Sequence, residues 1–122
     1  MKIIYQNKKA LFDYEILDQF KAGMILLGSE IKSIRAGHVN LKGSYVSVWE
    51  NKAVLRGAQI SRYKYDSTSV YDPFRDRELL LNKNELRKLV NYLNTQGVTI
   101  VPISVGLEGK YAKLVKIGRA HV

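Results

Sequence analysis

Residues 23–45 read GMILLGSEIKSIRAGHVNLKGSY, an apolar run followed by a short stretch in which isoleucines recur three residues apart. The run Met24–Leu27 predicts a buried strand. Gly28 is expected to end that strand, because glycine turns without a Cβ penalty. A short helix should follow, with Ser29 capping its start and Gly37 ending it in a left-handed conformation.

The predicted short helix has two different faces. Ile31 and Ile34 share one face, which should pack on a sheet, and Lys32 and Arg35 share another. Glu30 lies in the first turn, where the helix dipole favours a carboxylate. A helix this short is not stable alone. It therefore needs a sheet beneath it and would hold two cations outward, an arrangement that suits a folded polyanion.

Composition narrows the class of protein. The chain has 122 residues and is 46% hydrophobic, which predicts one globular domain. It has 20 Lys and Arg against 11 Asp and Glu, a net charge of +9 that favours a polyanionic partner over simple solubility. Cysteine is absent, which excludes disulfides and thiolate metal sites. No apolar run is long enough to span a bilayer and no secretion signal is present, so we expect a cytoplasmic protein.

The rest of the pattern is mainly β. Six strands are predicted, with turns at 18–21, 50–52 and 108–110: Leu11–Leu17, Gly23–Leu27, Ser44–Trp49, Ala53–Ile60, Val98–Leu107 and Tyr111–Ile117. Short hairpins and alternating strands favour a small closed barrel close to an OB-fold.

A longer helix is predicted between the fourth and fifth strands. From Asn82 to Thr95, leucines and a valine recur at three- and four-residue spacing. Asn82 or Asn84 can cap its start, and Gly97 should end it. This helix is expected to plug or flank the barrel. No repeat, linker or low-complexity run divides the chain.

Four ordered motifs resemble one known family. They are Asn7-Lys8-Lys9-Ala10 with Asp13-Tyr14; Gly23-x-x-Leu26-x-Gly28-Ser29-Glu30-Ile31-Lys32-Ser33-Ile34-Arg35 with Asn40-Leu41-x-x-Ser44-Tyr45; Asp72-Pro73-x-Arg75-x-Arg77-x-Leu79-Leu80-Leu81-Asn82-Lys83; and Gly97-Val98-Thr99-Ile100-Val101-Pro102. The chain resembles the bacterial small protein B family, the tmRNA-binding (SsrA-binding) proteins of trans-translation. The resemblance extends from Asn7 to about Lys116.

The resemblance implies a non-catalytic RNA-binding barrel. Members hold the tRNA-like domain of tmRNA and bring it to stalled ribosomes, where the protein body stands in for a missing anticodon arm. The implied partners are tmRNA and the ribosome. A monomer is expected, with no membrane, small-molecule substrate or cofactor involved.

The resemblance also implies which residues bind RNA. These are Asn7, Lys8, Lys9, Tyr14, Glu30, Lys32, Arg35, Arg75, Arg77, Leu80, Asn82 and Lys83. Judged without the family, residues 2–9 are better interpreted as a solvated basic arm, and Leu80 could be a core residue.

The segment after Asp72 offers a second basic feature. Pro73 fixes a turn that an Asx-type bond from Asp72 can stabilise. Arg75 and Arg77 alternate on an extended backbone, so they point the same way and can grip phosphates. The alternative is an internal ion-pair network with the nearby carboxylates Asp72, Asp76 and Glu78.

The segment Arg62-Tyr63-Lys64-Tyr65 interleaves cations with aromatic rings. Tyrosine rings can stack on unpaired bases while neighbouring cations hold phosphates. Alternatively, Tyr63 and Tyr65 are strand residues that cover the edge of the barrel. Residues 66–70 are expected to form an exposed loop.

Signals for an enzyme are absent from the sequence. His38 and His121 are the only histidines, and neither has further ligands at metal spacing. No nucleophile elbow or phosphate-binding loop is present. The competing hypotheses are therefore other binding proteins. One is a generic single-stranded RNA or ribosome-associated module, and the other is a protein-interaction barrel whose charge is incidental.

The last residues, 118–122, depart from the family pattern. Family members continue with a basic Gly-Lys-Lys run and a long cationic tail, whereas this sequence ends Arg119-Ala120-His121-Val122. The string IGRAHV is what the sequencing-adapter bases ATCGGAAGAGCACACGTC encode. The hypothesis is that residues 1–117 form the RNA-binding domain and that the ending is adapter read-through. Arg119 and His121 would then have no function, and this chain would bind tmRNA without supporting tagging.

Overall fold

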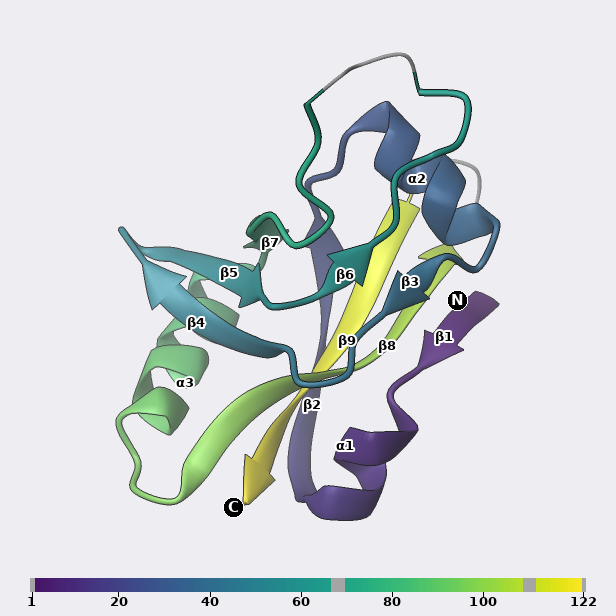
Figure 1. Ribbon diagram of the computed structural model, residues 1–122. Coiled ribbons are helices and arrows are strands. Elements are labelled where there is room, and N and C mark those ends of the chain that lie inside the picture. Colours follow the sequence, from purple (N-terminus) through teal and green to yellow (C-terminus); the bar gives the residue numbers. More distant parts are fainter. Residues whose placement is uncertain (1, 67–69, 109–111, 122) are drawn as a thin grey trace.

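The computed structural model describes residues 2–66, 70–108 and 112–121, which form strands and three helices (Figure 1). In chain order the elements are β1 (Lys2–Gln6), α1 (Lys8–Asp13), β2 (Glu15–Met24), α2 (Gly28–Arg35), β3 (Val39–Asn40), β4 (Tyr45–Trp49), β5 (Lys52–Arg56), β6 (Gln59–Ile60), β7 (Arg77–Leu80), α3 (Lys83–Leu93), β8 (Val98–Glu108) and β9 (Ala112–His121). No helix within the described residues is long and apolar enough to cross a bilayer.

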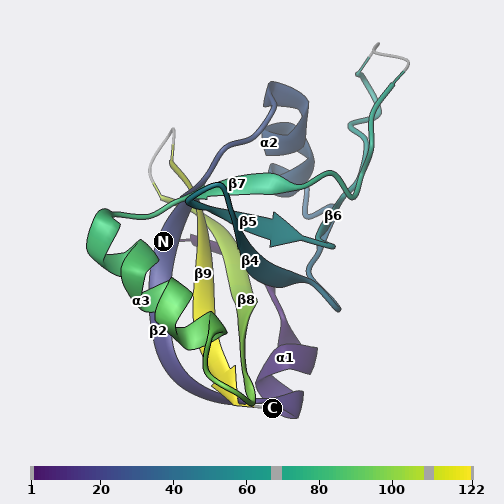
Figure 2. The same ribbon diagram turned by 90° about the vertical axis from the view of Figure 1, so that its left-hand side faces the viewer.

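The main sheet has seven strands in the order β1-β8-β9-β2-β7-β5-β4, joined by antiparallel pairs, and β3 pairs separately with β6. Its edge strand β4 also lies close to β8, so the sheet curls around the core (Figures 1 and 2). The predicted class, mainly β and OB-fold-like, is confirmed. The predicted closure is wrong for the described strands, because β1 and β4 remain as sheet edges.

The core fills the inside of this curl. Ile34, Leu41, Leu55, Leu89 and Ile100 are each at most 1% exposed and belong to one cluster. The buried leucine of α3 is part of that cluster, so this helix packs against the curled sheet, in line with the prediction that it plugs or flanks the barrel.

The start of α3 confirms the predicted cap. The Asn82 side chain accepts a hydrogen bond from Glu85 N at 2.8 Å, and Asn82 N donates to Glu85 Oε1 at 3.1 Å. The helix ends at Leu93 with Asn94 as its C-cap, so the prediction that Gly97 ends it is wrong; Gly97, at φ +78°, lies in the following turn, in which Val98 N donates to Thr95 O at 3.3 Å. The reciprocal bonds satisfy backbone donors that a helix start otherwise leaves unpaired.

The N-terminal segment is part of the fold, and its interpretation as a solvated arm is wrong. β1 pairs with β8, and α1 begins after Asn7, whose side chain accepts a hydrogen bond from Ala10 N. The predicted strand Leu11–Leu17 is wrong over its first residues, which belong to α1. Local β-propensity was outweighed there by the helix cap at Asn7.

β2 is longer than predicted and ends sooner. It runs without a turn through residues 18–21, with a register shift between Ile16 and Asp18. It ends at Met24, so Met24–Leu27 is not a buried strand; Ile25 and Leu27 are 47% and 49% exposed. The N-cap of α2 is Leu27 rather than the predicted Ser29, and Gly28 does not adopt a positive φ.

The β4–β5 hairpin confirms a predicted turn, and a second turn divides a predicted strand. Glu50 and Asn51 have φ of 49° and 61°, the pattern of a tight two-residue hairpin loop. Gly57 has φ +77° and splits the predicted strand 53–60 into β5 and β6. The predicted turn at 108–110 falls largely on residues outside the described ranges. β9 continues through 121, four residues beyond its predicted end.

Candidate nucleic-acid interface

Helix α2 displays the two cations that the sequence singled out. Ile34 is fully buried against the core, while Lys32 and Arg35 are exposed. Ser33 Oγ donates to Ser61 O at 2.7 Å, which ties the helix to the segment after β6. Gly37 ends the helix with φ +82°, as predicted. The helix is therefore held on its inner side and offers its charges on its outer side.

Beneath α2 lies a buried charged cluster centred on Glu30. Arg77 reaches Glu30 Oε2 through Nε at 3.0 Å and through a terminal nitrogen at 2.7 Å. Arg75 donates to both carboxylate oxygens, through Nε at 3.0 Å to Oε2 and through a terminal nitrogen to Oε1. The Tyr71 hydroxyl lies 3.0 Å from Oε2 and 2.8 Å from Ile60 O. One carboxylate thus joins α2 to Tyr71 and Arg75 before β7 and to Arg77 at its start.

The environment within this cluster shifts the pKa values of two of its groups, Glu30 and Tyr71. Burial alone would raise the pKa of Glu30, but hydrogen bonds from Arg75, Leu27 N–H and Arg77, with the charge of Arg77, outweigh it and hold that pKa below its ordinary value. Burial, then the negative charge of Glu30, raises the pKa of Tyr71 to about 12. At neutral pH the cluster therefore holds an ionised glutamate, two arginines and a neutral tyrosine.

This geometry corrects the predicted role of three residues. Glu30 and Arg77 are 1% and 0% exposed, so their side chains have no surface to offer to RNA. The side chain of Arg75 is 31% exposed and is engaged with Glu30. Arg75 and Arg77 do point the same way, as predicted, but toward a carboxylate inside the protein rather than toward phosphates.

The alternative prediction, that the two arginines take part in an internal ion-pair network, is confirmed. The carboxylates predicted to pair with them are wrong. Asp72 accepts a hydrogen bond from Phe74 N at 2.9 Å, which confirms the Asx turn. The other two carboxylates pair elsewhere on the surface, Asp76 with Arg56 at 2.5 Å and Glu78 with Lys52 at 3.6 Å. Sequence reasoning missed Glu30 and Tyr71 as partners of the arginines, since Glu30 lies 45 and 47 residues from them and no local pattern links the three.

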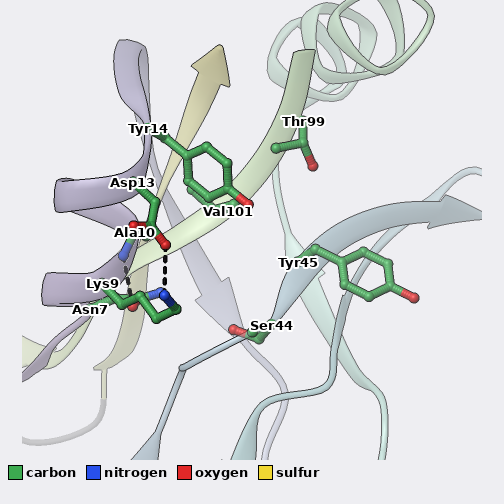
Figure 3. A pocket seen from close by; sticks show the side chains of 10 residues that line it. Asn7, Lys9, Ala10, Asp13, Tyr14, Ser44, Tyr45, Thr99 and Val101 are labelled. Atoms are coloured by element: carbon green, nitrogen blue, oxygen red, sulfur yellow. Dashed lines mark hydrogen bonds and ion pairs between the residues drawn. The ribbon is translucent and has the colours of Figure 1, made fainter. Parts of the chain in front are cut away.

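Three of the N-terminal candidates, Asn7, Lys9 and Tyr14, line a small cavity of about 260 Å³ between α1, β8 and the start of β4 (Figure 3). Asn7 is 3% exposed and donates to Pro102 O at 2.9 Å, so it holds α1 in place instead of presenting a surface. Lys8 and Lys9 are exposed, and Lys9 pairs with Asp13 at 2.9 Å. That hydrogen bond and charge raise the pKa of Lys9. The cavity is lined by Asn7, Lys9, Ala10, Asp13, Tyr14, Gly43, Ser44, Tyr45, Thr99 and Val101.

A third group lies where β7 leads into α3. Leu80 is 55% exposed, so the interpretation of it as a core residue is wrong. Asn82 and Lys83 are also exposed, although Asn82 uses its side-chain oxygen to cap α3. Leu80 pairs with Gly23 at the end of β2, which leads into α2.

The candidates therefore divide by burial. Exposed side chains come from α1, α2 and the β7–α3 junction, and buried ones hold those elements: Lys8, Lys9, Lys32, Arg35, Leu80, Asn82 and Lys83 are exposed, Tyr14 and Arg75 are half-buried, and Asn7, Glu30 and Arg77 are buried. Within the described residues, no group of three His, Cys, Asp or Glu side chains is placed to hold a metal ion.

Comparison with known proteins identifies the family. The family model described as SmpB protein matches residues 4–121. An SsrA-binding protein of Anoxybacillus flavithermus is 45% identical over 93% of this chain and 73% of its own length, and one of Lacticaseibacillus casei is 46% identical over 92% and 71%. A solved structure described as "tmRNA-SmpB: a journey to the center of the bacterial ribosome" superposes with a TM-score of 0.81 at 36% identity, covering 97% of this chain and 82% of that one. The chain belongs to the SmpB family.

Proposed function

We propose that this protein binds the tRNA-like domain of tmRNA and delivers it to stalled ribosomes for trans-translation. Membership of the SmpB family carries this proposal, because relatives across nearly the whole chain are SsrA-binding proteins. The proposed function is non-catalytic and cytoplasmic, and the protein performs it as a monomer without a cofactor. Its two partners are tmRNA and the ribosome.

The geometry of the candidate interface supports two different roles: exposed residues contact RNA, and buried residues position them. Lys32 and Arg35 are the proposed phosphate contacts of α2, since both are exposed on a helix that cannot shift easily. Glu30 and Arg77 act as positioning residues, because they fix α2 to the β6–β7 connection from inside. Rigid placement lowers the ordering cost of binding and favours an RNA of one particular shape.

Two further surfaces extend the proposed contact. Lys8 and Lys9 on α1 are exposed cations, and Asn7 positions them. At the β7–α3 junction, Leu80 offers apolar contact and Lys83 a charge. Since the three groups lie on different elements, a compact folded RNA or a large assembly such as the ribosome can engage them together better than a short single strand can.

A competition gel shift tests the proposal. Labelled tRNA-like tmRNA fragment is bound to the purified chain and challenged with tRNA and with random single-stranded RNA at moderate salt. Retention of the tmRNA fragment against both competitors is expected. Equal competition by random RNA would instead support the generic single-stranded RNA module, and absence of salt-dependent binding would leave only a protein-interaction barrel.

A further inference from the structure

The connection between β6 and β7 places two tyrosines beside α2. The ring centroids of Tyr63 and Tyr65 lie 5.3 Å apart with an edge-to-face angle of 69°. Lys32 Nζ lies 5.4 Å from the centre of the Tyr63 ring, and Lys64 Nζ lies 4.8 Å from that of Tyr65. Residues 61–66 form no strand, so the interpretation of these tyrosines as strand residues is wrong. Tyr65 is 72% exposed, which leaves a large aromatic surface open to solvent.

The tyrosine-bearing turn is attached to the body of the protein. Ser61 accepts a hydrogen bond from Ser33 Oγ of α2 at 2.7 Å, and Ser61 N donates to His38 O at 3.1 Å. Asp66 N donates to Tyr63 O at 2.9 Å, and this hydrogen bond closes the backbone turn that carries the two tyrosines. The backbone that carries the rings is therefore attached to the body of the protein next to α2.

The rings and α2 border an open depression of about 440 Å³. Its lining is Gly28, Ser29, Lys32, Tyr63, Tyr65 and Asp66. That volume lies within the range of about 300–1,000 Å³ in which small ligands are bound. The lining combines two tyrosine rings with one basic residue, Lys32, and one acidic residue, Asp66. An uncharged aromatic group suits the depression, while Lys32 and Lys64 at its border suit phosphates.

On the basis of the proposed function, we propose that a stacking site for one unpaired RNA base is formed by Lys32, Tyr63, Lys64 and Tyr65. Stacking on tyrosine accepts any base, and only an unpaired base exposes its face to a protein ring. In the unbound protein the two lysines rest on the ring faces. Exposed cation–π contacts are weak, so on binding the flexible lysine side chains move to the flanking phosphates and leave the rings to the base.

Ring-removing variants test the site. Tyr63→Leu and Tyr65→Leu are each expected to weaken binding of the tRNA-like tmRNA fragment by about tenfold, as loss of one stacked base does. Tyr65→Phe keeps the ring and should bind like the unaltered chain. The salt dependence of binding should be unchanged in all three variants, because no cation is removed. Trp49→Leu removes another exposed aromatic side chain, 63% exposed in the β4–β5 hairpin, and should leave affinity unchanged.

Photocrosslinking tests directly whether an unpaired RNA base contacts the tyrosine rings. A tmRNA fragment carrying 4-thiouridine at unpaired positions should crosslink to Tyr63 or Tyr65, located by mass spectrometry of the digested protein. Preferential binding of the tmRNA fragment, with Leu variants of undiminished affinity and no crosslink at either ring, would overturn the stacking site and leave the proposed function standing. A crosslink at these rings with random RNA, without preference for tmRNA, would support the stacking site while overturning the proposed function.

Discussion

At the scale of single residues, Glu30 decides how the candidate interface is held. Its carboxylate is buried and would be costly to desolvate alone. Two guanidinium groups and a tyrosine hydroxyl surround it, so each charge has a hydrogen-bonded partner. The three partners all come from residues 71–77, whereas Glu30 comes from α2. The network consequently defines where α2 lies relative to the β6–β7 connection.

Removing the charge of Glu30 should destabilise the protein strongly. Glu30→Gln leaves Arg77 buried without its counter-charge, and breaking such a pair costs about 3–5 kcal/mol in free energy of unfolding. Urea unfolding of both proteins measures the difference. Asp76→Asn is the matched control: its ion pair with Arg56 has a half-exposed carboxylate, so the loss should be about 0–1 kcal/mol. Equal losses in the two variants would contradict the special role of Glu30.

The same carboxylate makes stability depend on pH. The pKa of Glu30 is lower in the folded protein than in the unfolded chain, so folding favours its ionised form. Its contribution is fully present above the unfolded pKa of about 4.3 and is lost as pH falls through the lower folded pKa. Urea titrations between about pH 7 and pH 3 should show this loss. The Glu30→Gln variant should show a shallower acid dependence, and an identical slope would contradict the assignment.

Gly118 is a second residue of interest, because its surroundings leave little room for a side chain. A Cβ there would lie 2.6 Å from Ile103 Cδ1, 3.0 Å from Ile16 Cγ2 and 3.1 Å from the Asp18 carbonyl oxygen. Gly118→Ala should therefore cost about 1–3 kcal/mol through overpacking, measured by chemical denaturation. Gly28→Ala is the control, since a Cβ there meets nothing within 4 Å and φ is not positive. That variant should be neutral or slightly more stable.

At the scale of elements, α2 carries the proposed phosphate contacts on one face. Lys32→Glu with Arg35→Glu should lower affinity for the tRNA-like tmRNA fragment at least tenfold and reduce the log–log salt slope by about 1–2. Both side chains are exposed, so the fold should survive, as checked by circular dichroism.

A charge-matched control separates this surface from net charge. Arg87→Glu with Lys88→Glu makes the same change in charge on the exposed face of α3. Its effect on affinity should be much smaller than that of the α2 variant. If the two double variants weaken binding equally, overall charge and not α2 governs binding.

Elements with strong local signals were predicted correctly from the sequence. Helix α3 has regular leucine spacing and an Asn cap, and the β4–β5 hairpin has a polar two-residue turn. Helix α1 was missed because a six-residue helix has almost no periodicity, and its cap becomes effective only once Asn7 is fixed by Pro102. The exposed cations of α2 were predicted from spacing alone. The Glu30 network was not, because its partners meet only through the tertiary fold.

At the scale of the whole molecule, the curled sheet brings distant segments to one compact body. β2 and β9 pair across almost their full lengths, and β8 joins β1 to them (Figure 1). Three elements with exposed cations, α1, α2 and the start of α3, are thereby mounted on one rigid scaffold. A net charge of +9 on such a scaffold gives long-range attraction to any polyanion, whereas the proposed function assigns the selection of RNA shape to the spacing of the three elements.

Salt dependence distinguishes these two contributions for the whole molecule. With about four to six phosphates neutralised, the affinity for the tRNA-like tmRNA fragment should fall with a log–log salt slope of roughly −3 to −5. Fluorescence anisotropy from about 50 to 300 mM salt measures the slope, with tRNA as the matched competitor. We expect similar slopes for the two RNAs but tighter binding of the tmRNA fragment at every salt concentration, because charge acts on both and shape favours one. A preference for the tmRNA fragment that disappears at high salt would instead place selectivity in the phosphate contacts themselves, and a slope near zero would remove RNA from the proposed partners.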